Sequence, residues 1–132
     1  MIFVDTSAFF PLYNSTDAHH KTAMRIAGQL KEEGRDQVTS NIVVGETLTL
    51  LSMRVSKSTA VQFGKLIIQS GLHIFIIDQD LHASAWEIFQ SLKNKDVSFF
   101  DCTSFAIMKS MGIQTAFSFD KDFKDMGFVL LS

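Results

Sequence analysis

The sequence predicts a layered α/β fold with a mainly parallel central sheet of about five short strands. Three observations indicate it. Short apolar runs typical of β-strands alternate along the chain with segments whose apolar residues recur at helical spacing. Cap-forming and turn-forming residues separate these segments, and no internal repeat or low-complexity stretch interrupts them. Such alternation is typical of a parallel sheet with helices on both faces.

The first half of the chain contains two expected strands and four expected helices. Ile2 to Val4 is a β-type run that stops at Asp5, and Asp17 is placed to cap the second helix. Ser58 is placed to cap the fourth. The expected elements are a strand at 2–4, a short helix at 8–12, a helix from about 18 to 30, a weak strand at 38–39, a helix at 42–54 capped from 39–41, and a helix from 58 that closes at Gly71.

The second half continues the alternation. The clearest strand is the apolar run at 73–77, and Gly112 follows the helix that begins around Asp101. The expected elements are strands at 73–77, 115–119 and 128–131, a helix that starts at 78–80 and runs to 92, a helix at 101–111, and a short helical turn at 121–124.

Composition limits the possible classes of protein. The 132 residues suffice for one domain, which we expect to span 1–132, and no apolar run is long enough to cross a membrane. A net charge of −2 argues against a protein that coats nucleic acid, but not against one that grips a short piece of it. The single cysteine, Cys102, excludes an internal disulfide and is compatible with a reducing cytoplasm, where we expect the protein to be.

Four carboxylates occupy positions with strongly apolar neighbours. Asp101 interrupts the apolar run 99–108, Asp5 and Asp120 each end an apolar strand, and Glu46 lies in the most apolar helix. Each has an ordinary interpretation alone, as a helix cap, a turn residue or part of a solvated helix face. The carboxyl ends of parallel strands meet at one edge of a sheet, however, so these acids should converge. Converging carboxylates without basic neighbours repel each other and need a cation.

The chemistry of this ligand set indicates the kind of cation. All four side chains offer oxygen, and the chain has no Cys-x-x-Cys or His-x-x-x-His pair. Oxygen ligands favour Mg²⁺ or Mn²⁺ over zinc. Such ions activate water and neutralise phosphate charge, and a nearby carboxylate can orient that water or accept its proton. The pattern therefore predicts hydrolysis of phosphodiester bonds.

Four motifs, in this order, resemble those of the PIN-domain family, specifically the VapC-type toxins of toxin–antitoxin pairs. They are Val-Asp-Thr-Ser-Ala at 4–8, Glu-Thr-Leu-Thr-Leu-Leu at 46–51, Ser-Phe-Phe-Asp-Cys-Thr-Ser-Phe-Ala at 98–106, and Ala-Phe-Ser-Phe-Asp-Lys-Asp-Phe at 116–123. The resemblance covers essentially the whole chain. It implies a three-layer α/β/α fold and a metal-dependent endoribonuclease that cuts single-stranded or looped RNA with metal-activated water and leaves a 5′-phosphate.

The resemblance also assigns residues and partners. It implies that Asp5, Glu46, Asp101 and Asp120 are both the catalytic residues and the ligands of Mg²⁺, for which Mn²⁺ should substitute, and that Ser7 supports them by hydrogen bonding. It further implies a homodimer and a cognate antitoxin whose C-terminal tail blocks the acidic groove. Two positions depart from the family pattern. Phe100 replaces a small polar residue, a change that bears on substrate choice more than on the chemistry, and Ser118 replaces Thr but keeps the hydroxyl.

Several other polar residues are considered for a role near these acids. Arg54, Lys57 and Lys121 are candidate contacts for RNA phosphates, although each is also an ordinary surface residue. His19 and His20 lack a partner at ligand spacing and are interpreted as surface residues. Asp122 either joins the acids or lies on the solvated side of its turn, with the second favoured.

Two functions from other classes stay open. Asp5 at a strand end could be the nucleophile of a phosphotransferase, although those enzymes usually carry a second acid two residues later, where this chain has Ser7. A PIN fold could also persist as a binding module without activity. The presence of all four acids argues against that alternative, because a retired site has no reason to keep their mutual repulsion.

Overall fold

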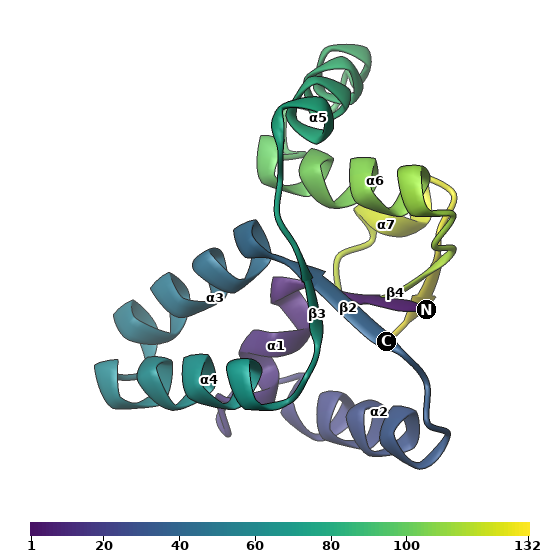
Figure 1. Ribbon diagram of the computed structural model, residues 1–132. Coiled ribbons are helices and arrows are strands. Elements are labelled where there is room, and N and C mark those ends of the chain that lie inside the picture. The colour runs from purple at the N-terminus through teal and green to yellow at the C-terminus, as the bar shows by residue number, and fades with distance from the viewer.

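Five short strands form one parallel sheet in the order β3-β2-β1-β4-β5 (Figure 1). The computed structural model describes residues 1–132. The strands are β1 (Ile2–Val4), β2 (Gln37–Ser40), β3 (His73–Phe75), β4 (Thr115–Phe117) and β5 (Val129–Leu131). Because every pair is parallel, all five carboxyl ends lie along one edge of the sheet, as the sequence predicts.

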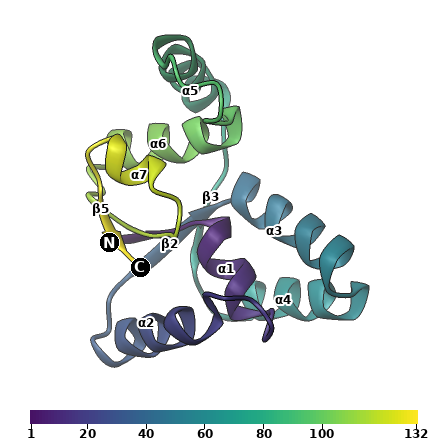
Figure 2. The ribbon, with the colours of Figure 1, turned by 180° about the vertical axis from the view of Figure 1, so that it is seen from behind.

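Seven helices cover the two faces of this sheet. They are α1 (Thr6–Leu12), α2 (His20–Glu32), α3 (Asn41–Arg54), α4 (Lys57–Gln69), α5 (Gln79–Ser91), α6 (Phe99–Met111) and α7 (Asp122–Asp125). Both views place α5, α6 and α7 on one side of the strands and α1, α2 and α4 on the other (Figures 1 and 2). The expected three-layer α/β/α arrangement is confirmed. None of the helices combines the length and the apolar character that a membrane span requires.

The core lies on both faces of the central strand. All three residues of β1 are buried, and Phe105 of α6 packs edge-on against Phe123 of α7, with ring centroids 5.0 Å apart. On the other face, the rings of Phe9 and Tyr13 both lie edge-on to Phe63 of α4. These aromatic contacts fix α1 against α4 and α6 against α7, and therefore fix the loops that follow β1 and β4.

Two predicted caps are wrong, for local reasons. Ser56 rather than Ser58 caps α4, because the Ser56 hydroxyl accepts a hydrogen bond from the Thr59 amide at 3.0 Å. Only two residues then separate α3 from α4. Asp17 does not cap α2. Its carboxylate accepts from the amide of His19 at 2.8 Å within the preceding turn, and the helix begins at His20.

Two strands end two residues earlier than predicted. In each case, a backbone amide just beyond the strand donates its hydrogen bond to a side chain and not to a neighbouring strand. After β3, the amide of Ile77 donates to the side chain of Asn41 at 3.0 Å. After β4, the amide of Phe119 donates to the hydroxyl of Ser7 at 2.9 Å. Asp120 therefore follows the sheet in a loop instead of ending the strand itself.

Candidate active site

One cavity of about 470 Å³ is lined by all four acids that the sequence singles out, together with Ser7. We call this cavity the acidic pocket; Asp17 lines it as well as the four predicted acids Asp5, Glu46, Asp101 and Asp120. They come from the end of β1, from α3, from the first turn of α6 and from the loop after β4. Parallel pairing of β1 with β4 brings two of them to the same edge, and the packing of helices against that edge adds the other two.

Asp5 is the most buried of the four predicted acids and is 5% exposed. Its Oδ2 accepts hydrogen bonds from the hydroxyls of Ser7 at 2.8 Å and Ser118 at 3.1 Å, and also from the Ser7 amide. The two hydroxyls lie 2.9 Å apart, so they join the end of β1 to the end of β4. Burial raises the pKa of Asp5, while the donors around it act in the opposite direction.

Glu46 is positioned by a contact between two helices. The hydroxyl of Thr6, in the first turn of α1, donates to Oε1 of Glu46 at 2.7 Å. The hydroxyl of Thr47 donates to the Val43 carbonyl at 2.8 Å, which satisfies that buried group within α3. The carboxylate of Glu46 is therefore held by one oxygen, and its other oxygen has no protein hydrogen-bond partner.

Asp101 has both a structural and an electrostatic role. It is the third residue of α6, and it forms a capping box with Ser98: the Asp101 amide donates to the Ser98 hydroxyl at 3.0 Å, and the Ser98 amide donates to the Asp101 carboxylate at 3.3 Å. Burial, together with the negative charges of Asp5 and Asp120, raises the pKa of Asp101 to about 7, and the hydrogen bonds from Ser98 act in the opposite direction. A role in helix capping alone does not explain why Asp101 lies close enough to two other acids to be repelled by them.

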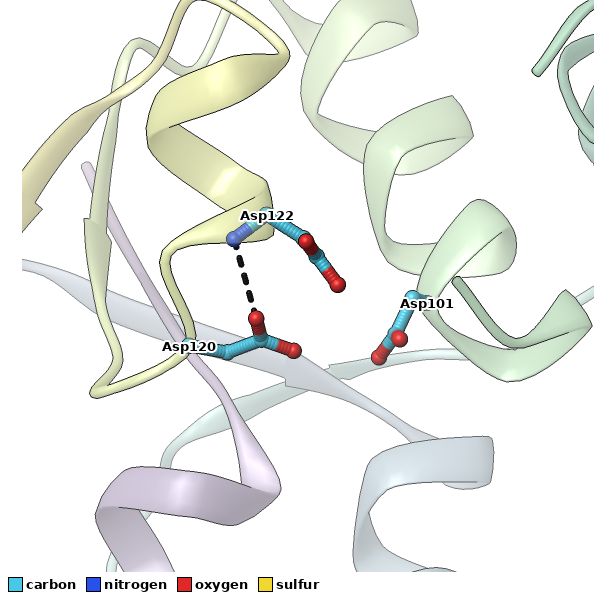
Figure 3. A group of neighbouring side chains, drawn as sticks. All are labelled: Asp101, Asp120 and Asp122. Atoms are coloured by element: carbon cyan, nitrogen blue, oxygen red, sulfur yellow. Dashed lines mark hydrogen bonds between the residues drawn. The ribbon is translucent and has the colours of Figure 1, made fainter. Parts of the chain in front are cut away.

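Asp120 and Asp101 form the tightest group of acids together with Asp122. One carboxylate oxygen from each of the three lies within 4.8 Å of the others, and the three side chains face a common space (Figure 3). The amide of Asp122 donates to Oδ1 of Asp120 at 2.9 Å, which fixes the first turn of α7 against the loop (Figure 3). Burial, and then the charge of Asp120, raise the pKa of Asp122. Asp122 therefore joins the acids, contrary to the favoured interpretation of the sequence.

The pocket carries negative charge that the chain itself does not balance. The only ion pair in the structure joins Arg35 to Glu33, away from the pocket. Clustered acids that form no salt bridge, with the pKa values of Asp5, Asp101 and Asp122 raised, are the arrangement that a bound cation stabilises. The donors are carboxylate oxygens, which suit a hard divalent ion such as Mg²⁺ or Mn²⁺. The residues present therefore fit the metal that the sequence predicts.

The three predicted phosphate contacts differ in their positions. Arg54, at the end of α3, lines the acidic pocket and places its guanidinium 5.9 Å from the centroid of the Phe10 ring. Lys57 instead lines a separate cavity between α3 and α4. Lys121 is exposed and directly precedes α7, where its charge acts on Asp122.

Sequence reasoning missed residues that reach the pocket through tertiary contacts. Thr6 has no predicted role of its own within the Asp-Thr-Ser motif, although a hydroxyl directly after Asp5 is a usable signal. His19, interpreted as a surface residue, is exposed but also lines the pocket, and its ring stacks on Phe119 with centroids 4.3 Å apart. No spacing in the sequence relates His19 to Phe119.

The fold and the acidic pocket define a class of protein, and comparison with known proteins identifies it. A family model of the PIN domain matches residues 2–129. The chain therefore belongs to the PIN-domain family. The crystal structure of FitAcB from Neisseria gonorrhoeae has the same fold, with a TM-score of 0.74 at 18% identity, over 100% of this chain and 97% of that one.

Within the family the chain is of the VapC type. It is 40% identical over 129 residues to the 23S rRNA-specific endonuclease VapC20 of Mycobacterium tuberculosis, with 98% of this chain and 96% of the relative covered. It is 32% identical over 124 residues to a VapC ribonuclease of Archaeoglobus fulgidus, with 91% and 77% covered. The crystal structure of the M. tuberculosis VapC20, a Sarcin-Ricin loop cleaving toxin, matches with a TM-score of 0.88 at 39% identity, over 98% and 97% of the two chains.

Proposed function

We propose that this protein is a metal-dependent endoribonuclease and the toxin of a toxin–antitoxin pair. The observation that carries the proposal is the acidic pocket, in which four carboxylates from distant parts of the chain converge and none of them forms a salt bridge. The names of the VapC relatives, an rRNA-specific endonuclease and a ribonuclease, support RNA as the substrate. We propose that residues 1–132 act as one nuclease domain in the cytoplasm.

The proposed metal ligands are Asp5, Glu46, Asp101 and Asp120. We propose Mg²⁺ as the ion, with Mn²⁺ able to replace it; when bound, the ion lowers the pKa of water and neutralises charge on the phosphate. The hydroxyls of Ser7 and Ser118 hold the carboxylate of Asp5 in place.

Glu46 has the contact pattern expected of a group that handles a proton. Thr6 holds one carboxylate oxygen of Glu46, and the other is free of protein partners. The free oxygen can orient the attacking water and accept its proton. Attack on phosphorus with departure of the 3′-oxygen leaves a 5′-phosphate and a 3′-hydroxyl on the two RNA products.

The proposed RNA contacts are Arg54, which lines the pocket, and two lysines outside its lining. Arg54 is the only lysine or arginine that lines it, and its stacking on Phe10 restrains a side chain that is otherwise mobile at a surface. Lys121 beside Asp120 and Lys57 at the start of α4 are proposed as more peripheral phosphate contacts.

We further propose a homodimer and inhibition by a cognate antitoxin. The family resemblance suggests both, and large apolar side chains exposed on α3 and α4, such as Met53 (79%) and Ile68 (81%), offer surface for a protein partner. Light scattering on the purified protein measures its mass directly. A single-chain mass at micromolar concentration contradicts the dimer and leaves the nuclease proposal intact.

The decisive experiment maps cut sites on ribosomal and total RNA incubated with the purified protein. We expect cleavage in Mg²⁺ or Mn²⁺, products with 5′-phosphates, no cleavage in EDTA, and no cleavage by Asp5→Asn or Asp101→Asn. Undiminished cleavage in EDTA contradicts the metal mechanism, and full activity of either variant contradicts the residue assignment. Trapping a phosphoryl group on Asp5 would instead favour the phosphotransferase alternative.

A further inference from the structure

Phe100 is an exposed aromatic residue directly beside the active-site acid Asp101. Its side chain is 53% exposed. Its backbone is fixed, because its carbonyl accepts a 2.6 Å hydrogen bond from the hydroxyl of Thr103 in the first turn of α6. Leaving half of a phenylalanine in water at a rigid position costs hydrophobic free energy that burial would recover.

Phe100 forms one wall of a second cavity, of about 400 Å³, against the first half of α3. We call it the Phe100 slot; its lining residues from α3 are Asn41, Ile42, Gly45, Glu46, Thr49 and Leu50. Glu46 and Leu50 also line the acidic pocket. The slot therefore adjoins the acidic pocket, where the proposed reaction takes place.

Two features of α3 make this slot open and apolar. Gly45 lies inside the helix, where glycine costs roughly 1 kcal/mol relative to alanine, yet a Cβ built there would meet nothing within 4 Å. No close approach of another segment explains this glycine, and its missing side chain widens the slot. The hydroxyl of Thr49 donates to the Gly45 carbonyl at 3.0 Å, so it is satisfied within the helix.

We propose that the Phe100 slot receives an unpaired base of the RNA substrate, stacked on the ring of Phe100 next to the bond that is cut. This inference rests on the proposed ribonuclease activity and adds a determinant of substrate choice to it. Single-stranded and looped RNA exposes unstacked bases, and proteins bind such bases by stacking them on aromatic rings. An apolar cavity of about 400 Å³ with an aromatic wall, beside the acidic pocket, offers the surface on which an unpaired base can stack.

The test pairs variants of the slot with changes in the RNA. The variants are Phe100→Leu, which keeps apolar bulk without a ring, Phe100→Tyr, which keeps the ring, and Trp86→Leu as a matched control at an exposed aromatic on α5. The substrates are one short RNA that the wild type cuts and a series of the same RNA with a single abasic nucleotide at each position around the cut.

We expect Phe100→Leu to lower kcat/KM by about tenfold or more, as loss of a stacked base does, and Phe100→Tyr and Trp86→Leu to stay near wild type. At one position, removing the base should lower kcat/KM by the same factor for the wild type and for Phe100→Tyr. The same abasic RNA should lower kcat/KM of Phe100→Leu only slightly, because this variant has already lost the ring on which the base stacks. Gly45→Leu should also lower kcat/KM by filling the slot, without lowering the melting temperature.

Three results would overturn the inference. Abasic penalties that are equal in wild type and Phe100→Leu at every position exclude a stacked base. Unchanged cleavage by Phe100→Leu together with a changed oligomeric mass assigns the slot to a protein contact instead. If the wild type cuts no RNA at all, the proposed function fails and the slot has no RNA ligand. If the wild type cuts RNA but the abasic penalties do not depend on Phe100, only the base-stacking inference fails and the proposed nuclease activity stands.

Discussion

The hydroxyl of Thr6 donates a 2.7 Å hydrogen bond to Oε1 of Glu46, and so connects the first turn of α1 to the middle of α3 across 40 positions of sequence. Thr6 is buried, and it immediately follows Asp5. One short segment after β1 thus supplies one carboxylate of the pocket and aligns a second that belongs to another helix.

Replacing Thr6 by valine removes this donor and keeps the shape of the side chain. We expect Thr6→Val to lower kcat by about tenfold or more with a smaller effect on KM, because a hydrogen bond to a charged group contributes roughly 1.5–3 kcal/mol and Glu46 would lose its orientation. Thr6→Ser keeps the hydroxyl and should restore most of the activity. Equal loss in both variants would point to a packing role instead, which a fall in melting temperature would reveal.

Repulsion among the acids should make the metal-free protein less stable as pH rises. Burial and the charges of Asp5 and Asp120 raise the pKa of Asp101 to about 7 in the folded chain, above its value of about 3.9 in the unfolded chain. The unfolded state therefore loses this proton first, so the contribution of Asp101 is full below pH 4 and is lost as pH rises to about 7.

Thermal unfolding in EDTA between pH 4 and pH 8 measures this contribution. We expect Asp101→Asn to be more stable than wild type at pH 8 by a few degrees in melting temperature, and this advantage to shrink toward pH 4. Asparagine can still accept the hydrogen bond from the Ser98 amide, so the capping box persists. Asp96→Asn, at an exposed loop position, is the matched control and should show no such pH dependence. A pH-independent gain would attribute the effect to helix capping instead.

Asp122 should contribute to metal binding, because one of its oxygens lies within 4.8 Å of oxygens of Asp101 and Asp120. We expect Mn²⁺ to raise the melting temperature of the wild type, and Asp122→Asn to weaken the apparent affinity on the order of tenfold, which is about 1.4 kcal/mol. Asp125→Asn removes the same charge from the same helix and should bind Mn²⁺ like wild type. Equal weakening in both variants would reduce the role of Asp122 to general electrostatics.

Arg54 and Lys57 form a natural comparison, because only Arg54 lines the acidic pocket. We expect Arg54→Ala to raise KM for RNA several-fold and to reduce the slope of log KM against log salt by about one, as loss of a phosphate contact does. Lys57→Ala should change both less. Steady-state kinetics at a series of salt concentrations measures both effects. A larger effect of Lys57→Ala would indicate that the RNA binds along the cavity between α3 and α4.

Much of the fold could be predicted because it depends on local patterns. Alternating apolar runs and helical periodicity specify the order of strands and helices, and Gly112 in the left-handed conformation ends α6 as its sequence indicates. The convergence of Asp5 and Asp120 was also predictable, since parallel strands bring their carboxyl ends to one edge. That these acids bind a metal stays a prediction.

Only the tertiary structure decided which other side chains reach that edge. The Thr6–Glu46 bond, the contact between the hydroxyls of Ser7 and Ser118, and the place of Asp122 beside Asp101 depend on how helices pack against the sheet. Packing fixes distances between residues far apart in the chain, and no periodicity in the sequence encodes them. The amino-acid order alone thus determined the elements and the acids, and the three-dimensional fold determined the groups that surround those acids.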